Sequence, residues 1–278
     1  MTPSPGTQAA PSAGAVRRAW SNPFRAAWRT LAILLACAFF YTVWHCRILF
    51  VRDRARMHAL CTIWTRRWAA VLRRCAGIRV SVAGPIPPNG VMIAPNHSGY
   101  LDVLAIGSIV PCFFVAKADV ESWPIVGSLF RVSGHISVSR KRSKALADVT
   151  EAIEERLREG QSVCVFLEGT STGNDRVLPF YPPLVEPAIR AEANIVPLGI
   201  RWRADDPRID VAEDVAYWKD HTFGPHAWRV LGLREIEAEL SFGDPVFTTT
   251  SERKKLAHHC GLSTAFLCTL PYKNDRPV

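Results

Sequence analysis

A histidine and an aspartate five residues apart form the first group of side chains that could transfer a proton. His97 follows the apolar run Val91–Ala94, which predicts a strand, and Asp102 precedes a second apolar run, which places it near the first turn of a helix. A turn between them could fold the carboxylate onto one imidazole nitrogen and raise the basicity of the other. This is the base half of a Ser-His-Asp triad, with a substrate hydroxyl in the place of the serine. The spacing alone favours an ordinary loop histidine beside a helix-capping Asn96 or Ser98.

A turn of small polar residues follows another predicted strand. Glu168, Gly169 and Thr170 come directly after Val163–Leu167. Backbone N–H groups and hydroxyls in such a turn can approach a polar headgroup or an oxyanion closely. An ordinary loop with a solvated glutamate is the alternative.

Two further stretches complete the set. Gly134 to Arg140 reads as a strand that leads into a basic cluster, where Arg140 could hold a phosphate or a carboxylate. The alternative is a solvated, positively charged rim. Val196-Pro197 lies in a strand with proline at an edge or an end, and we interpret it as an apolar wall of a groove.

The elements that must position these residues alternate between strands and helices. The strands are expected at Ile78–Val82, Val91–Ala94, Phe113–Ala116, Ile136–Val138, Val163–Leu167 and Ile195–Ile200. The clearest helix is Ser143–Arg158, whose apolar residues fall on one face and which Gly160 follows as a stop signal. Alternation of this kind predicts an α/β domain with a mixed or mainly parallel sheet. Sites in such sheets collect at loops beyond the strand ends.

The N-terminal part has a different character. Residues 1–23 are rich in Pro, Ala, Ser, Thr and Gly, which predicts a disordered tail. Leu31–Val51 is apolar and long enough to span a bilayer, although its uncharged part is shorter. Met57–Cys75 predicts a basic amphipathic helix with tryptophans, which suits a membrane interface. The same apolar stripe would also suit a helix docked on the domain. Arginines flank Leu31–Val51 on both sides, so they do not set its orientation.

Charge and cysteine content narrow the possible partners. Lys plus Arg is 34 and Asp plus Glu is 25, which gives a net charge of +9. This excess favours nucleic acid, anionic lipid or phosphorylated substrates without choosing among them. The chain has eight cysteines and no C-x-x-C pair, so we expect reduced thiols rather than a zinc site or a disulfide framework.

Taken together and in order, the four stretches resemble the glycerolphosphate and lysophosphatidate acyltransferase family. The matching blocks are Asn96-His97 to Asp102, Gly134 to Arg140, Phe166 to Thr172 and Val196-Pro197. Lys117 and the stretch from Trp123 to Gly127 also fall where the family has similar residues. The resemblance covers roughly residues 60 to 245.

The resemblance implies a single αβα layered acyltransferase domain with a mixed sheet, preceded by an N-terminal membrane-docking helical motif. The expected division is a disordered tail at 1–23, membrane-associated helices at 24–76, the acyltransferase domain at 77–247 and a C-terminal tail at 248–278. The resemblance also implies that the protein is membrane-associated, with its active site on the cytoplasmic face of the inner membrane.

The implied reaction moves a fatty acyl chain from acyl-CoA or acyl carrier protein to the free hydroxyl of a lysolipid, with 1-acyl-sn-glycerol-3-phosphate as the first acceptor and phosphatidic acid as the product. His97 would be the general base and Asp102 would orient it, without an acyl-enzyme and without a metal or organic cofactor. The substrate-binding residues would be Asn96, Arg140, Glu168, Gly169 and Thr170. The partners are membrane lipid, the lysolipid and the thioester donor, with no nucleic acid.

Two positions depart from the family pattern. Leu167 replaces a proline, which is a mild change, and Ser171 replaces an arginine expected to contact the acceptor phosphate. The loss of a guanidinium removes a bidentate phosphate anchor, for which Arg140, Lys141, Arg142 or Arg176 could substitute. The stretch after Glu168 also resembles a subgroup that acylates lyso-ornithine lipids, which is the alternative acceptor. A non-enzymatic basic protein that binds membranes or nucleic acid is the alternative of another class.

Overall fold

A computed structural model describes residues 21–48, 51–117, 133–138, 145–248 and 252–273. Within these residues, seven strands form one sheet in the order β1-β7-β6-β2-β5-β3-β4. The strands are β1 (Ile78–Ala83), β2 (Met92–Pro95), β3 (Phe113–Lys117), β4 (Ile136–Val138), β5 (Val163–Cys164), β6 (Ile195–Arg203) and β7 (Ile236–Phe242). All neighbours are parallel except β6 and β7, which are antiparallel, so the expected mixed sheet is confirmed.

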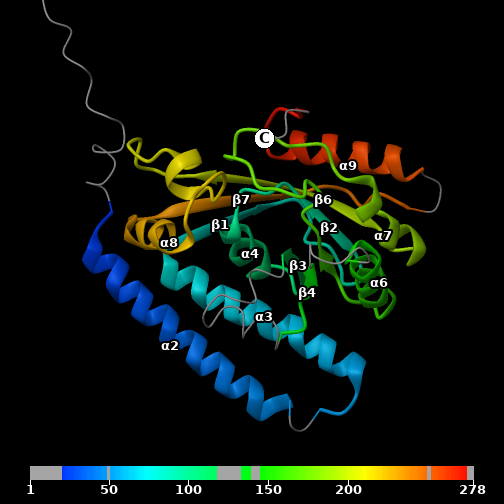
Figure 1. Cartoon of the computed structure of the whole chain (residues 1–278), viewed down its shortest axis with the longest axis horizontal. Helices are drawn as coiled ribbons and strands as arrows, with labels where there is room; N and C mark the ends of the chain where they lie inside the picture. Colours follow the sequence, from blue (N-terminus) through cyan, green and yellow to red (C-terminus); the bar gives the residue numbers. More distant parts are fainter. Residues whose placement is uncertain (1–20, 49–50, 118–132, 139–144, 249–251, 274–278) are drawn as a thin grey trace, which may run out of the picture.

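Helices cover both faces of this sheet. The helices are α2 (Pro23–Ile48), α3 (Arg54–Ala76), α4 (Tyr100–Gly107), α6 (Ala145–Arg158), α7 (Glu186–Arg190), α8 (Phe223–Gly232) and α9 (Arg253–Leu267). Met92 packs in one core with α6 and α9, and its neighbour Ile93 packs in a second core with α4 and α8. Successive residues of a strand point to opposite faces, so the two cores lie on either side of the sheet. Figure 1 shows α9 and α4 on these opposite faces, which confirms the αβα layering.

The strand boundaries differ from expectation at two places. β5 is shorter than Val163–Leu167, because the N–H of Val165 makes the last bond to β2 and the carbonyl of Leu167 accepts a hydrogen bond from Tyr181 instead. β6 is longer than expected, because Arg201–Arg203 pair with β7. β7 lies outside the expected strands, although its strict alternation of buried and half-buried residues is a strand signal.

The C-terminal part also differs from expectation. Residues 248–278 were expected to form a tail, but α9 lies there and packs on the sheet. Leu256, Ala257 and Cys260 are buried at helical spacing, so this helix belongs to the core of the domain. The helix expected at Ser143–Arg158 is present as α6, with residues 143 and 144 outside the described part.

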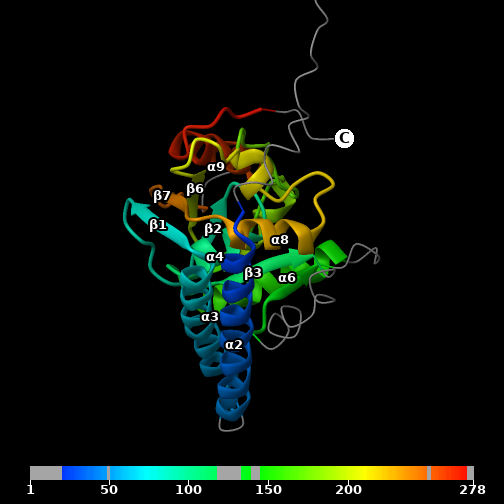
Figure 2. The same ribbon diagram turned by 90° about the vertical axis from the view of Figure 1, so that its left-hand side faces the viewer.

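An N-terminal pair of helices stands beside the sheet domain. Asp53 caps α3 by accepting a hydrogen bond from the backbone N–H of Arg56 at 2.7 Å. The Trp64 indole of α3 donates to the carbonyl of Phe40 in α2, and the two rings lie 5.0 Å apart. At the other end of α2, the buried Arg29 donates to carbonyls in the last turn of α8 and just after it, those of Leu231, Leu233 and Arg234. Figure 2 shows α2 and α3 side by side, extending away from the sheet.

One face of α2 remains exposed and apolar. Large side chains recur at helical spacing on this face: Phe24, Trp28, Leu31, Leu35 and Phe39. The segment Pro23–Arg47 is long and apolar enough to cross a membrane by length and composition. An exposed stripe of this size is costly in water, which makes α2 a candidate for membrane docking.

Candidate active site

His97 and Asp102 lie at the carboxyl end of β2, as the sequence predicts. β2 ends at Pro95, and α4 begins at Tyr100 with Asp102 in its first turn. The imidazole Nδ1 lies 2.9 Å from the carboxylate Oδ2 of Asp102. A carboxylate only accepts, so Nδ1 carries the proton and Nε2 presents a lone pair. The histidine side chain is 23% exposed and the aspartate side chain is fully buried, which gives a substrate hydroxyl access to the ring alone.

Four donors surround the buried carboxylate of Asp102. Besides His97, the backbone N–H groups of Ser98 and Gly99 donate to Oδ2 at 2.6 and 3.0 Å. The indole N–H of Trp202 donates to Oδ1 at 2.7 Å. A buried charge is tolerated when it is hydrogen-bonded in this way, so the carboxylate is held in one orientation.

Phe166 forms a wall of the site that the sequence pattern does not predict. Its ring stacks on the His97 imidazole with centroids 3.9 Å apart and an interplanar angle of 28°. The stacking opposes tilting of the ring and the Nδ1 bond to Asp102 opposes its rotation within the plane, so together they fix the direction of Nε2. The family block from Phe166 to Thr172 was the available signal, but the stacking partner could not be read from it.

Glu168 lies beside His97, with its carboxylate bonded to the backbone. It is fully buried. Its Oε1 accepts the backbone N–H of His97 at 2.7 Å and its Oε2 accepts the N–H of Leu178 at 2.8 Å. Glu168 therefore holds the backbone at His97 and Leu178, and the substrate contact expected of it stays a prediction.

Asn96 is also bonded to the backbone, and its expected substrate contact likewise stays a prediction. The residue is fully buried. Its amide donates to the carbonyl of Ile200 at 2.9 Å and accepts the N–H of Ile200 at 2.7 Å. Both ends of the amide thus bind the backbone of β6, so Asn96 fastens the histidine loop to the sheet.

The remaining expected substrate-binding residues divide into two groups. Gly169 is exposed and Thr170 is half-buried, at the tip of the turn that carries Glu168. Arg140 lies outside the described residues, as do Lys141, Arg142 and the stretch from Trp123 to Gly127, and the side chain of Lys117 is not described. The contribution of Arg140 to phosphate binding therefore stays a prediction.

Ser171, the departure from the family pattern, contacts the segment that covers the histidine loop. Its hydroxyl donates to the carbonyl of Tyr217 at 2.8 Å, and the N–H of Tyr217 donates to the carbonyl of Ser98 at 2.8 Å. Thr172 completes the enclosure by donating its N–H to the carbonyl of His97 at 2.9 Å. The small Ser171 side chain thus links two loops.

The half-buried Tyr100 and the buried His226 hold the segment that contains Ala216 and Tyr217. The Nε2 of His226 lies 3.0 Å from the carbonyl of Ala216, so Nε2 carries the proton and Nδ1 accepts from the Tyr100 hydroxyl at 3.1 Å. Burial, followed by repulsion from His221 and Arg229, lowers the pKa of His226 to about 4. The ring is therefore neutral at pH 7, and this tautomer ties α8 to α4.

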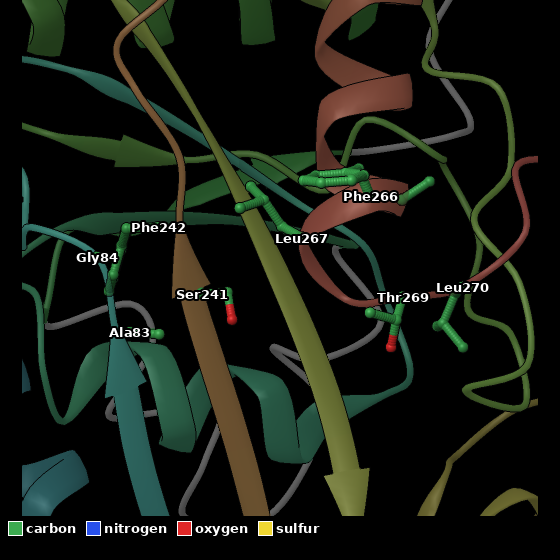
Figure 3. Close-up of a pocket in the computed structure, with 9 residues that line it drawn as sticks. Ala83, Gly84, Ser241, Phe242, Phe266, Leu267, Thr269 and Leu270 are labelled. Atoms are coloured by element: carbon green, nitrogen blue, oxygen red, sulfur yellow. The ribbon is translucent and has the colours of Figure 1, made fainter.

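A separate cavity of about 580 Å³ opens between the end of α9 and the ends of β1 and β7. Figure 3 shows Phe242, Leu267 and Thr269 on its walls. His97, Asp102 and Glu168 are not among its lining residues. Within the described residues, no group of three His, Cys, Asp or Glu side chains is placed to hold a metal ion.

Known proteins are similar to this chain in sequence and in fold. The model of the Acyltransferase family matches residues 77–201. The chain is 27% identical to a 1-acyl-sn-glycerol-3-phosphate acyltransferase of Neisseria gonorrhoeae over 60% of this chain and 64% of that protein, so it spans a little under two thirds of this relative. It is 32% identical to a lyso-ornithine lipid O-acyltransferase of Rhodobacter capsulatus, over 66% of this chain and 68% of that protein.

The fold is also found in a solved structure. The crystal structure of the 1-acyl-sn-glycerophosphate acyltransferase of Thermotoga maritima matches with a TM-score of 0.59 and 19% identity, covering 85% of this chain and 94% of that one. At this identity the match speaks for the fold alone. The Rhodobacter relative supplies the similarity in sequence across two thirds of its length. The chain that places His97 against Asp102 in this αβα domain therefore belongs to the acyltransferase family.

Proposed function

We propose that this protein transfers a fatty acyl chain from a thioester donor to the free hydroxyl of a lysolipid. The observation that supports the proposal is the partly exposed imidazole of His97. Its Nδ1 is hydrogen-bonded to the buried Asp102, while its Nε2 can accept a proton. A general base of this kind suits the activation of an alcohol, which is a poor nucleophile until its proton is removed.

The steps balance without a covalent enzyme intermediate. Nε2 of His97 takes the proton of the acceptor hydroxyl as the hydroxyl oxygen attacks the carbonyl carbon of the thioester. The tetrahedral intermediate collapses by breaking the C–S bond, and the thiolate leaves with the proton from His97. Asp102 stabilises the imidazolium formed in between, because its carboxylate faces Nδ1. These steps draw on no metal or organic cofactor, so transfer should be unchanged in EDTA.

The acceptor we propose first is 1-acyl-sn-glycerol-3-phosphate, named in the Neisseria relative, with phosphatidic acid as the product. Gly169 and Thr170, at the open tip of their turn, and Arg140 are proposed to bind it. The donor is acyl-CoA or acyl carrier protein.

A second acceptor, a lyso-ornithine lipid, is favoured by a specific observation. Ser171 stands where the family has a phosphate-binding arginine, and its hydroxyl is engaged by the carbonyl of Tyr217. The Rhodobacter relative at 32% identity is named for this acceptor. An acceptor headgroup without a phosphate would need no guanidinium at this position.

The site is proposed to work at a membrane surface, on the cytoplasmic face of the inner membrane. The exposed apolar stripe of α2, which includes Leu31 and Leu35, supports docking of the N-terminal helices in lipid. Both substrates would then meet where the acceptor lipid lies. Nucleic acid is not proposed as a partner.

The test uses the full-length protein in detergent or lipid vesicles. Acyl-CoA and acyl carrier protein, each with a labelled chain, are offered with a panel of lysolipids that includes both acceptors. We expect an ester product with at least one combination of donor and acceptor. The control variant His259→Ala, on the exposed face of α9, should form the same product. Absence of product with every pair, from protein that binds membranes and melts cooperatively, would reject the proposal.

A further inference from the structure

The second oxygen of Asp102 has a partner of its own, Trp202. The indole N–H donates to Oδ1 at 2.7 Å, across 100 positions of sequence. The other three donors, from His97, Ser98 and Gly99, all go to Oδ2. Trp202 therefore touches the half of the carboxylate that faces away from the imidazole.

Trp202 is held firmly enough to fix that oxygen. It lies in β6, is 2% exposed, and follows Ile200 on the same face of the strand. Its backbone N–H and carbonyl both bind the side chain of Asn174, at 3.2 Å each. Two residues earlier, Ile200 is bound twice by Asn96. The strand that carries the indole is thus tied to the loop that carries His97.

A carboxylate with donors on one oxygen alone can pivot about its Cβ–Cγ bond. If Asp102 pivots, the Oδ2–Nδ1 contact lengthens and the imidazole loses the partner that orients it. A donor on Oδ1 opposes this rotation, because the rotation would break a charge-assisted hydrogen bond in a buried place. The indole of Trp202 is the donor that the structure records there.

We propose that Trp202 is a positioning residue for acyl transfer, which acts by fixing the Asp102 carboxylate that orients His97. The inference rests on the proposed function, since it concerns the same base. It assigns to β6 a part in the chemistry beyond lining the core, and it makes the tryptophan at this position matter for turnover rather than for substrate binding.

The alternative is that Trp202 only fills the core, where it packs with Leu198 and Val215. A purely structural residue would change activity in proportion to the loss of folded protein, whatever stands at position 102. A positioning residue would matter only while Asp102 carries a carboxylate. The two roles therefore differ in whether the effects of substitutions at 202 and 102 are independent.

The experiment is a double-mutant cycle on the full-length protein, with Trp202→Phe, Asp102→Asn and both together. Trp202→Phe is expected to lower kcat about tenfold, as for a lost hydrogen bond to a charged group, with KM for donor and acceptor within about twofold. In the Asp102→Asn background the same change is expected to lower kcat by less than about twofold. Trp218→Phe is the matched control, because its indole N–H donates at the same 2.7 Å to the carbonyl of Ala212 instead; its kcat should stay within about twofold of wild type.

A second variant guards against a folding defect in Trp202→Phe. Replacement of Trp202 by benzothienylalanine keeps the bicyclic shape and exchanges the N–H for sulfur, and it should reproduce the loss in kcat. Undiminished kcat in this variant, or an equal loss in both backgrounds of the cycle, would overturn the inference while wild-type transfer left the proposed function standing. A wild-type protein inactive with every lysolipid would instead reject the proposed function.

Discussion

The backbone N–H of His97 donates to the buried carboxylate of Glu168 at 2.7 Å, which joins two motifs that lie 71 residues apart. The other carboxylate oxygen accepts the N–H of Leu178. Glu168 thus fixes the backbone position of His97, and its burial separates it from solvent.

Substitution of Glu168 by glutamine tests this placement. An amide offers one acceptor oxygen, so one of the two N–H groups would face an NH₂ group, at a cost of about 1–3 kcal/mol. We expect a lower melting temperature and a lower kcat, with the KM for the lysolipid nearly unchanged. Steady-state kinetics and thermal melts check this, with Glu151→Gln on the exposed face of α6 as the control. A rise in acceptor KM alone would show that Glu168 binds substrate instead.

Gly99 should not tolerate a side chain. Its φ is +147°, and a Cβ there would lie 2.7 Å from the Cβ of Tyr217. Gly99→Ala is expected to destabilise the protein by about 2–3 kcal/mol and to reduce kcat, because the Gly99 N–H also binds Asp102. Thermal melts and initial rates check both effects. Gly224→Ala, where a Cβ meets open space, is the control, and equal behaviour of the two variants would contradict the tight covering by Tyr217.

Ser171 should decide between the two acceptors. Ser171→Arg restores the cation of the family pattern, and we expect it to raise the preference for lysophosphatidate over lyso-ornithine lipid by about tenfold. The ratio of kcat/KM values for the two acceptors is the measurement. Ser171→Ala is the matched control, because it removes the hydrogen bond to Tyr217 without adding charge. An unchanged ratio in Ser171→Arg would remove the link between this position and the headgroup.

The apolar stripe of α2 should carry membrane binding. A double change of Leu31 and Leu35 to glutamate places two charges on the face proposed to meet lipid, so we expect a large loss of protein from floated liposomes at moderate salt. Leu146→Glu, at an exposed leucine of α6, adds one charge elsewhere and should float like wild type. Full flotation of the double variant would place the membrane contact on another surface.

His226 should make stability fall in mild acid. Its pKa is lowered to about 4 in the folded protein, against about 6.5 when unfolded. Between these values the unfolded chain holds more protons, so stability is full above about pH 6.5 and declines as pH falls toward about 4, by at most about 3 kcal/mol. Melting temperatures at neutral and mildly acid pH measure the slope. His226→Phe should flatten it and His259→Phe, on an exposed helix face, should not; equal slopes in all three proteins would contradict the assignment.

The sequence predicted the contact between His97 and Asp102 better than the residues that hold this pair in place. Five residues from a strand end to a first helical turn suffice to place Asp102 against His97, because that contact is local. Asn96 binds Ile200 and Glu168 binds His97, partners 104 and 71 residues away along the chain, so the sequence pattern does not predict these contacts. The indole of Trp202 reaches Asp102 from β6, and spacing cannot predict such a partner.

The architecture shows the same division. Strands that coincide with a short run of β-branched and apolar residues, such as β1 and β4, lie where this residue pattern predicts them. β7 carries the required alternation, with Ile236, Ala238 and Leu240 buried, yet charged residues between them hide the strand in a polar stretch. The hydropathy of α9 varies little around the helix. Its buried face consists largely of small residues, such as Ala257 and Cys260, which pack on the sheet without a strong hydrophobic signal.

The most direct test of the account is the rate of acyl transfer by His97→Ala, measured on protein whose melting temperature and membrane binding match those of wild type. If the imidazole removes the proton of the lipid hydroxyl, kcat/KM should fall by at least about 10²–10⁴ with every acceptor that wild type uses. Transfer at an undiminished rate would contradict the role given to the ring that Asp102 holds.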